Sequence, residues 1–149
     1  MRRSFQPHFW LSLLLAVWAG LVIGISFIEA PLKFQAPGIT RELGLGIGRL
    51  VFGALNKTEM GLLAVVSLLT LLGFAQLKIG FRLTFLAFFL LVAFQLFFLL
   101  PILDDRAVRL LAGEPLAPSW HHLVYGILEA AKVVLLFSLF ALSYGRRAA

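Results

Sequence analysis

Long apolar runs separated by short polar stretches dominate the pattern of this sequence. Four runs, at about residues 9–30, 60–77, 83–103 and 120–144, are long enough to cross a hydrocarbon core of about 30 Å as helices. We therefore predict an all-α fold, an integral membrane four-helix bundle. The bundle is expected to form a single domain over residues 1–149.

The connection between the first two runs has a helical pattern of its own. Over residues 39–56, apolar side chains recur at helical spacing at Leu43, Ile47, Leu50 and Ala54. This pattern predicts an amphipathic interfacial helix between helices one and two. Thr58 and Glu59 then resemble the N-cap and the acidic first turn of the second span.

Prolines and small residues suggest how the spans end and pack. Pro31 with Pro37 is expected to close the first span and start a turn, and Pro101 to end the third span, because proline lacks the N–H group that a helix interior requires. Gly20 and Gly24 have the small-xxx-small spacing that lets another helix approach closely. That partner is predicted within the bundle, in a homo-oligomer, or in a larger membrane complex that also contacts the third span.

Composition supports the membrane class and excludes several others. Hydrophobic residues make up 61% of the chain and charged residues 13%, and the mean hydropathy is +0.99. The absence of cysteine excludes disulfides, thiolate metal sites and cysteine nucleophiles. The net charge of +6 comes from basic residues that bracket the apolar runs, so the lipid bilayer is the expected partner and nucleic acid is not.

The positions of the basic residues also suggest an orientation. With the amino terminus inside, Lys and Arg residues are equally numerous on the two sides, but the inner ones lie closer to the helix ends. We therefore predict that both termini are cytoplasmic.

The fourth run carries a stripe of polar side chains. At about 100° per residue, His122, Tyr125, Glu129 and Lys132 fall within an arc of about 80°. Glu129 and Lys132 are expected to lie about 10 and 15 Å deeper in the bilayer than His122. An i,i+3 ion pair that only stabilises the bundle is one interpretation. Because ionisable groups in a membrane are costly, a functional site is the other.

Polar residues of the other spans lie at a similar expected depth. Glu29 marks the outer end of the first span, and Gln95 is the deepest polar side chain of the third. Each also has a simpler interpretation, Glu29 as an interfacial carboxylate and Gln95 as an interhelical hydrogen-bond donor. Together with the stripe they predict a polar pocket that opens to the outer face and is closed on the inner side.

Metal and haem sites are weaker hypotheses. His121, His122, Asp104 and Asp105 are candidate metal ligands, but adjacent acids in a loop are typical of a solvated face. A bis-histidine haem that used His8 with either later histidine would have to span the bilayer, which disfavours it. The sequence requires no cofactor.

Three short motifs and one histidine form a recognisable pattern along the chain. The motif positions are Trp18, Ala19 and Gly20, then Phe27, Ala30, Pro31 and Phe34, then Gly44, Gly48, Arg49 and Phe52. The histidine, His121 or His122, lies near the start of the fourth span. With these positions the sequence resembles the transmembrane protein 205-like family, small four-helix membrane proteins that carry a domain of unknown function. The resemblance implies an architecture and no particular activity.

Three functional hypotheses follow from the sequence. The first is binding or transport of a small or amphipathic ligand in the outer pocket, through His122, Tyr125, Glu129, Lys132, Glu29 and Gln95. The second is a membrane-embedded enzyme that uses acid–base or metal-assisted chemistry on a lipid-soluble substrate. The third is a small accessory subunit of a larger membrane complex.

Overall fold

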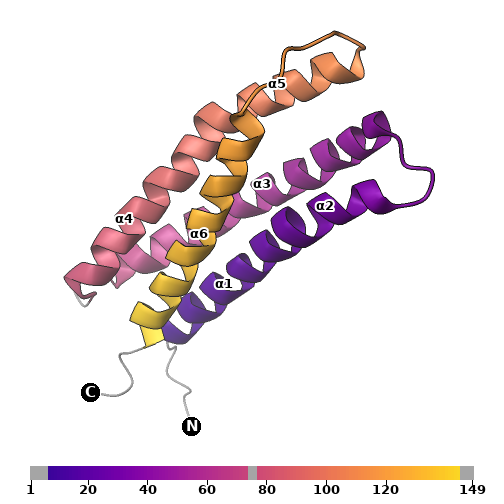
Figure 1. Ribbon diagram of the computed structural model, residues 1–149. Coiled ribbons are helices and arrows are strands. Elements are labelled where there is room, and N and C mark those ends of the chain that lie inside the picture. Colours follow the sequence, from indigo (N-terminus) through magenta and orange to yellow (C-terminus); the bar gives the residue numbers. More distant parts are fainter. Residues whose placement is uncertain (1–6, 74–76, 145–149) are drawn as a thin grey trace.

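The chain folds into long helices. A computed structural model describes residues 7–73 and 77–144, and this part contains helices and connections but no strand. Within it, four helices are long and apolar enough to cross a membrane: Phe9–Gln35, Arg41–Leu72, Ile79–Leu111 and His121–Ser143 (Figure 1). The predicted all-α architecture with four candidate spans is confirmed.

The first long helix passes through Pro31 without stopping. It consists of α1 (Pro7–Val22), the π-helical η1 (Ile23–Glu29), α2 (Ala30–Leu32) and the 3₁₀ turn η2 (Lys33–Gln35). Directly before the proline, the Ala30 N–H donates to the Ile25 carbonyl, five residues back. The wider π turn keeps the backbone bonded up to the residue that has no N–H. The helix therefore continues past Pro31 and ends at Gln35, two residues before Pro37, whereas the sequence predicted its end at about residue 30.

The third long helix repeats this arrangement. It comprises α4 (Ile79–Phe94), the π-helical η4 (Gln95–Leu99) and α5 (Leu100–Leu111). Here the Leu100 N–H donates to the Gln95 carbonyl, again five residues back and directly before Pro101. Pro101 thus lies inside a continuous helix, contrary to the prediction that it ends the span.

The second long helix, α3 (Arg41–Leu72), is continuous over 32 residues. Its N-cap is Thr40, whose side chain accepts a hydrogen bond from the Leu43 N–H at 3.2 Å. The separate amphipathic helix predicted for residues 39–56 is instead the first half of α3. No proline interrupts this stretch, and Thr58, predicted as an N-cap, donates from its hydroxyl to the Ala54 carbonyl inside the helix at 3.0 Å.

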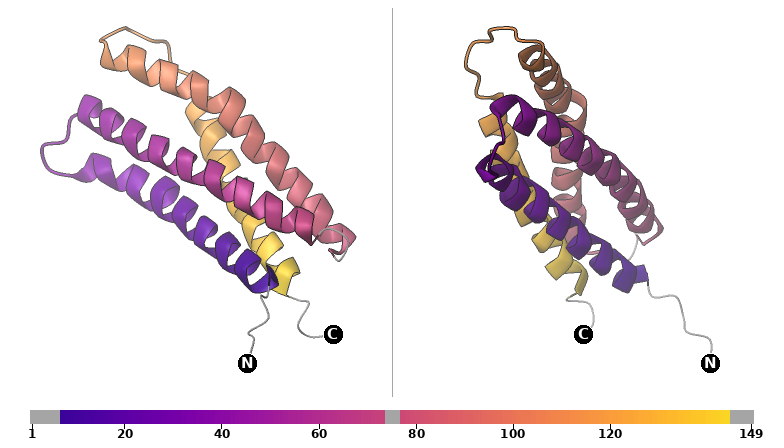
Figure 2. Two further views of the ribbon diagram at one scale, coloured as in Figure 1. Left: turned by 180° about the vertical axis from the view of Figure 1, so that it is seen from behind. Right: turned by 90° about the vertical axis from the view of Figure 1, so that its right-hand side faces the viewer.

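The last helix, α6 (His121–Tyr144), packs against α1 and α4, while α3 packs against α1 and α5 (Figures 1 and 2). The start of α1 and the end of α6 lie side by side, and we call this end of the bundle the terminal end. The connections at residues 36–40 and 112–120 lie at the opposite end, which we call the loop end (Figure 1).

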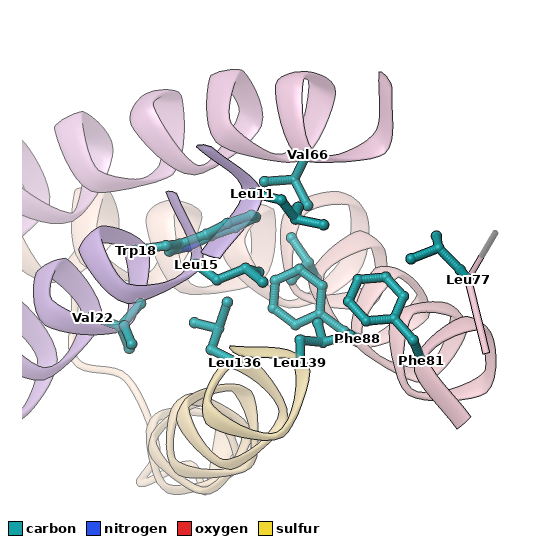
Figure 3. Close-up of a cluster of buried hydrophobic side chains, with 12 residues drawn as sticks. Leu11, Leu15, Trp18, Val22, Val66, Leu77, Phe81, Phe88, Leu136 and Leu139 are labelled. Atoms are coloured by element: carbon teal, nitrogen blue, oxygen red, sulfur yellow. The ribbon is translucent and has the colours of Figure 1, made fainter. Parts of the chain in front are cut away.

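The apolar core fills the terminal end of the bundle. Side chains from α1, α3, α4 and α6 converge there, and the Trp18 ring packs edge-on against Phe88 with 4.9 Å between ring centroids (Figure 3). The buried core members are Leu11, Leu15, Trp18, Ala19, Val22, Val66, Leu77, Phe81, Phe88, Val92, Leu136 and Leu139. These side chains pack against one another in the interior of this part of the bundle.

Candidate functional site

A lysine and two glutamates form a buried charged network at mid-length of the helices. The Lys132 ammonium on α6 donates to Glu59 Oε1 at 2.8 Å and Oε2 at 3.1 Å, and to Glu129 Oε1 at 2.7 Å. All three side chains are at most 2% exposed. At about 1.5 Å per residue, Glu59 lies about 27 Å along α3, so the network is remote from both helix ends. We call these three residues the charged network.

Glu129 accepts hydrogen bonds from both π-helical segments. Ser26 in η1 donates from its hydroxyl to Glu129 Oε2 at 2.9 Å, and Gln95 in η4 donates from Nε2 to Glu129 Oε1 at 3.0 Å. The extra residue in a π turn changes which side chains face inward, and such turns are frequent at functional sites. Three helices therefore meet at one carboxylate.

Trp18 connects the charged network to the apolar core. Its indole N–H donates to Glu59 Oε1 at 2.8 Å, while its ring lies in the core against Phe88. The indole thus satisfies one carboxylate oxygen and also covers the terminal side of the charged network with apolar surface.

The charges of the network do not balance. With both carboxylates ionised and the lysine protonated, the sum is −1. Buried charges are tolerated when they are paired and hydrogen-bonded, and an uncompensated charge in a low-dielectric interior is costly. The site therefore favours one additional positive charge.

On the loop side, Tyr125 and Phe52 cover the network. The buried Tyr125 hydroxyl faces the Glu129 carboxylate and interacts with it. The Tyr125 ring packs edge-on against Phe52 of α3, with 5.8 Å between centroids. Lys33 Nζ lies 5.3 Å from the centroid of the Phe52 ring.

Lys33 also binds Glu29, at 3.2 Å, on the loop side of η1. The Lys33 side chain is 8% exposed and that of Glu29 is 31% exposed, so this pair lies between the buried network and the outside of the bundle. The backbone of α3 leaves space for it at Gly48, where a Cβ atom would press against the end of Lys33. Gly44, one turn earlier, leaves space for the Phe34 ring in the same way.

The predicted aspartate metal ligands take part in exposed ion pairs. Asp104 on α5 accepts two hydrogen bonds from Arg49 of α3, at 2.6 and 3.2 Å, and Asp105 lies 4.0 Å from Arg109. Across the residues that the structure describes, no group of three or more His, Asp or Glu side chains has an arrangement suited to a metal ion. These aspartates are typical of the solvated face that the sequence suggested.

The two histidines at the start of α6 lie apart from the charged network. His122 is exposed, and His121 is half-buried with an Nδ1 atom that has no hydrogen-bond partner in the described part of the chain. The side chain of His8, the other histidine of the haem hypothesis, lies outside the described residues.

The structure therefore brings together part of the predicted site. Glu129, Lys132 and Gln95 are in direct contact, Tyr125 adjoins them, and Glu29 lies at the edge in a separate ion pair. His122 does not join them. For Gly20 and Gly24, an added Cβ atom would meet nothing within 4 Å, so the close helix contact predicted there is not made within the described chain.

The sequence reasoning missed two central residues, Glu59 and Trp18. For Glu59, the sequence pattern that could have revealed its burial is the spacing of small and apolar residues along one face of α3. Its buried positions follow one another at intervals of four or seven residues and include a glutamate: Gly44, Gly48, Leu55, Glu59, Val66 and Thr70.

Comparisons of the chain with family models, with curated proteins and with solved structures find no match.

Proposed function

We propose that the protein spans a membrane and binds or transports a small or amphipathic ligand at the charged network, which the ligand reaches from the loop end. The observation that carries this proposal is the buried contact of Lys132 with Glu59 and Glu129. Ion pairs of this kind contribute little more to stability than well-packed apolar residues of similar volume. Ionisable groups inside candidate membrane spans are therefore functional groups by default.

The direction of access is supported by the contrast between the two sides of the network. The terminal side is filled by the apolar core around Trp18 and Phe88. The loop side contains the partly exposed Glu29–Lys33 pair and the Tyr125 hydroxyl, which faces Glu129. A terminal side filled by apolar side chains and a loop side with a partly exposed ion pair favour a ligand that enters and leaves on the loop side.

The roles of the residues follow from their positions. Glu129 and Lys132 provide the charged floor, Glu59 holds the lysine, and Gln95 and Ser26 orient Glu129. Tyr125 and the Glu29–Lys33 pair line the access side. The proposed orientation places the terminal end, with both termini, in the cytoplasm.

Ligand-dependent stabilisation tests this proposal. We would measure the melting temperature of the purified protein in lipid nanodiscs with three amphiphiles of equal chain length: octylammonium, octanoate and octanol. A ligand that binds only the folded state raises the melting temperature as its concentration increases. We expect octylammonium to give the largest increase, because the network favours one additional positive charge.

The variants Glu129→Gln and Lys132→Met identify the binding site. Each should remove or change the ligand preference, whereas Glu114→Gln, an exposed carboxylate paired with Arg109, should keep it. Identical stabilisation by all three amphiphiles in the original protein and in both network variants would contradict the proposal.

A further inference from the structure

We propose that the charged network is a proton-binding site and that Glu129 is the carboxyl group that takes up the proton. This inference rests on the proposed function, since it specifies a proton as a ligand of the same site. Its starting point is the charge of −1 that two carboxylates and one ammonium carry together in the buried centre of the bundle. One bound proton makes the network neutral.

The neighbours of Glu59 cannot accept a hydrogen bond from a protonated carboxyl group. Glu59 is contacted by the Lys132 ammonium and by the Trp18 indole N–H. Both groups are donors only, without a lone pair for an O–H hydrogen. Protonation of Glu59 would leave a buried hydroxyl without an acceptor, which is costly. Glu59 therefore remains the ionised partner of Lys132.

The neighbours of Glu129 can reverse their roles. The Ser26 hydroxyl donates to Glu129 Oε2 and can rotate to accept instead. Gln95 donates from Nε2, and its own Oε1 is buried with no hydrogen-bond partner in the described part of the protein. Rotation of the amide group presents that oxygen to a protonated Glu129. The Tyr125 hydroxyl offers a third acceptor on the loop side.

Within residues 7–73 and 77–144, the polar groups that face Glu129 come from each element around it. They are Ser26 from η1, Gln95 from η4, and Lys132 and Tyr125 from α6, with Glu59 of α3 across the ammonium. A protonated carboxyl group has one O–H, so proton uptake reverses one of these two hydrogen bonds, that to Ser26 on η1 or that to Gln95 on η4. Protonation of Glu129 is therefore coupled to the local geometry of the first or the third long helix.

Infrared difference spectroscopy detects this proton directly. The purified protein in nanodiscs would be titrated with acid, and the carbonyl stretch of protonated carboxyl groups recorded. We expect one protonation step that is lost in Glu129→Gln and retained in Glu42→Gln, which changes an exposed carboxylate at the start of α3. Persistence of the same step in Glu129→Gln would overturn the inference.

Ser26→Ala provides a milder variant in case Glu129→Gln does not fold. Hydrogen bonds to an ionised acceptor are stronger than those to a neutral one, so loss of this donor disfavours the ionised form. The midpoint should move to higher pH by about 0.5 to 1 unit. An unchanged midpoint in Ser26→Ala would contradict the assignment to Glu129.

Sodium distinguishes a proton site from a metal-cation site. At constant ionic strength, replacing choline chloride with sodium chloride should leave the midpoint unchanged. A midpoint that falls as sodium increases would show that a metal cation competes for the site and would overturn the proton assignment. Amphiphile binding that persists without a protonation step would refute only this inference, whereas a protonation step without amphiphile binding would refute only the ligand function.

Discussion

Ser26 and Gln95 lie on π-helical segments of two different long helices, and their side chains donate to the two oxygens of the same carboxylate, that of Glu129. In each helix the proline follows two residues after the π segment ends, at Pro31 and Pro101. A π-helical segment followed by a proline thus occurs twice around the Glu129 side chain.

The π turn before each proline has a simple physical basis. A proline inside an α-helix removes one hydrogen bond and its ring clashes with the carbonyl four residues back. A wider turn ahead of it relieves the clash and rotates the preceding side chains relative to a regular helix. This rotation is consistent with the inward position of Ser26 and Gln95, next to Glu129. The prolines thus help to position the site although they do not contact it.

Removal of the Ser26 hydroxyl is expected to destabilise the bundle. Ser26→Ala deletes a half-buried donor to an ionised carboxylate, and we expect a loss of about 1 to 2 kcal/mol in the free energy of unfolding. Ser138→Ala on α6 is the matched control, because the Ser138 hydroxyl donates only to the Val134 carbonyl of its own helix. Unfolding in mixed micelles measures the free energy of unfolding of both variants. Equal losses in Ser26→Ala and Ser138→Ala would contradict a stabilising role for the Ser26–Glu129 hydrogen bond.

Lys132 should be the most sensitive position of the network. At neutral pH, Lys132→Met leaves two buried carboxylates without a counter-charge, and we expect a loss of about 3 to 5 kcal/mol. The triple variant Glu59→Gln, Glu129→Gln and Lys132→Met removes every charge of the network. It should be more stable than Lys132→Met alone, since no buried charge remains unpaired.

An exposed ion pair gives the control for this comparison. Arg49→Met breaks the ion pair with Asp104, in which the Arg49 side chain is 45% exposed and the Asp104 side chain 54% exposed. We expect it to lower the free energy of unfolding by less than about 1 kcal/mol. The contrary result concerns the triple variant of the charged network. If its loss in the free energy of unfolding equals the sum of the losses in Glu59→Gln, Glu129→Gln and Lys132→Met, the three residues do not act as one charge network.

Hydropathy predicted the four candidate spans because each is defined by a long continuous apolar run. It failed at the junctions, where the local signals are ambiguous. The amphipathic spacing over residues 39–56 and the cap signals at Thr58 and Glu59 suggested a separate segment, but α3 continues through both. Its path is set by packing against a neighbouring helix, as at Gly44 and Gly48, where Phe34 and Lys33 lie against the backbone. A local sequence pattern does not contain that neighbour.

The candidate site was predictable where a single helical face carries it. Tyr125, Glu129 and Lys132 share a face of α6 by their spacing alone, and all three are buried. Glu59 was assigned to a helix start because an acid after threonine is typical of a first turn. The position of Ser26 depends on the π turn, and a period of 3.6 residues does not predict which side chains such a turn directs inward.

The glycines of α3 should respond to substitution in opposite directions. Gly44→Ala places a methyl group against the Phe34 ring, and we expect a loss of about 1 to 3 kcal/mol. Gly46→Ala, two residues away on the same helix, meets nothing within 4 Å. Because alanine favours helix, it should be neutral or stabilising by up to about 1 kcal/mol. Thermal unfolding compares the two, and equal effects would show that Phe34 does not constrain Gly44.

The proposed orientation can be tested with single cysteines, since the natural chain has none. Ala36→Cys and Ala117→Cys place a thiol in the two connections at the loop end, and Lys78→Cys places one between α3 and α4; all three side chains are exposed. A membrane-impermeant maleimide added to intact cells should label the first two but not the third. After permeabilisation all three should react, which controls for thiol reactivity. Labelling of Lys78→Cys alone in intact cells would reverse the orientation and place the access side of the charged network in the cytoplasm.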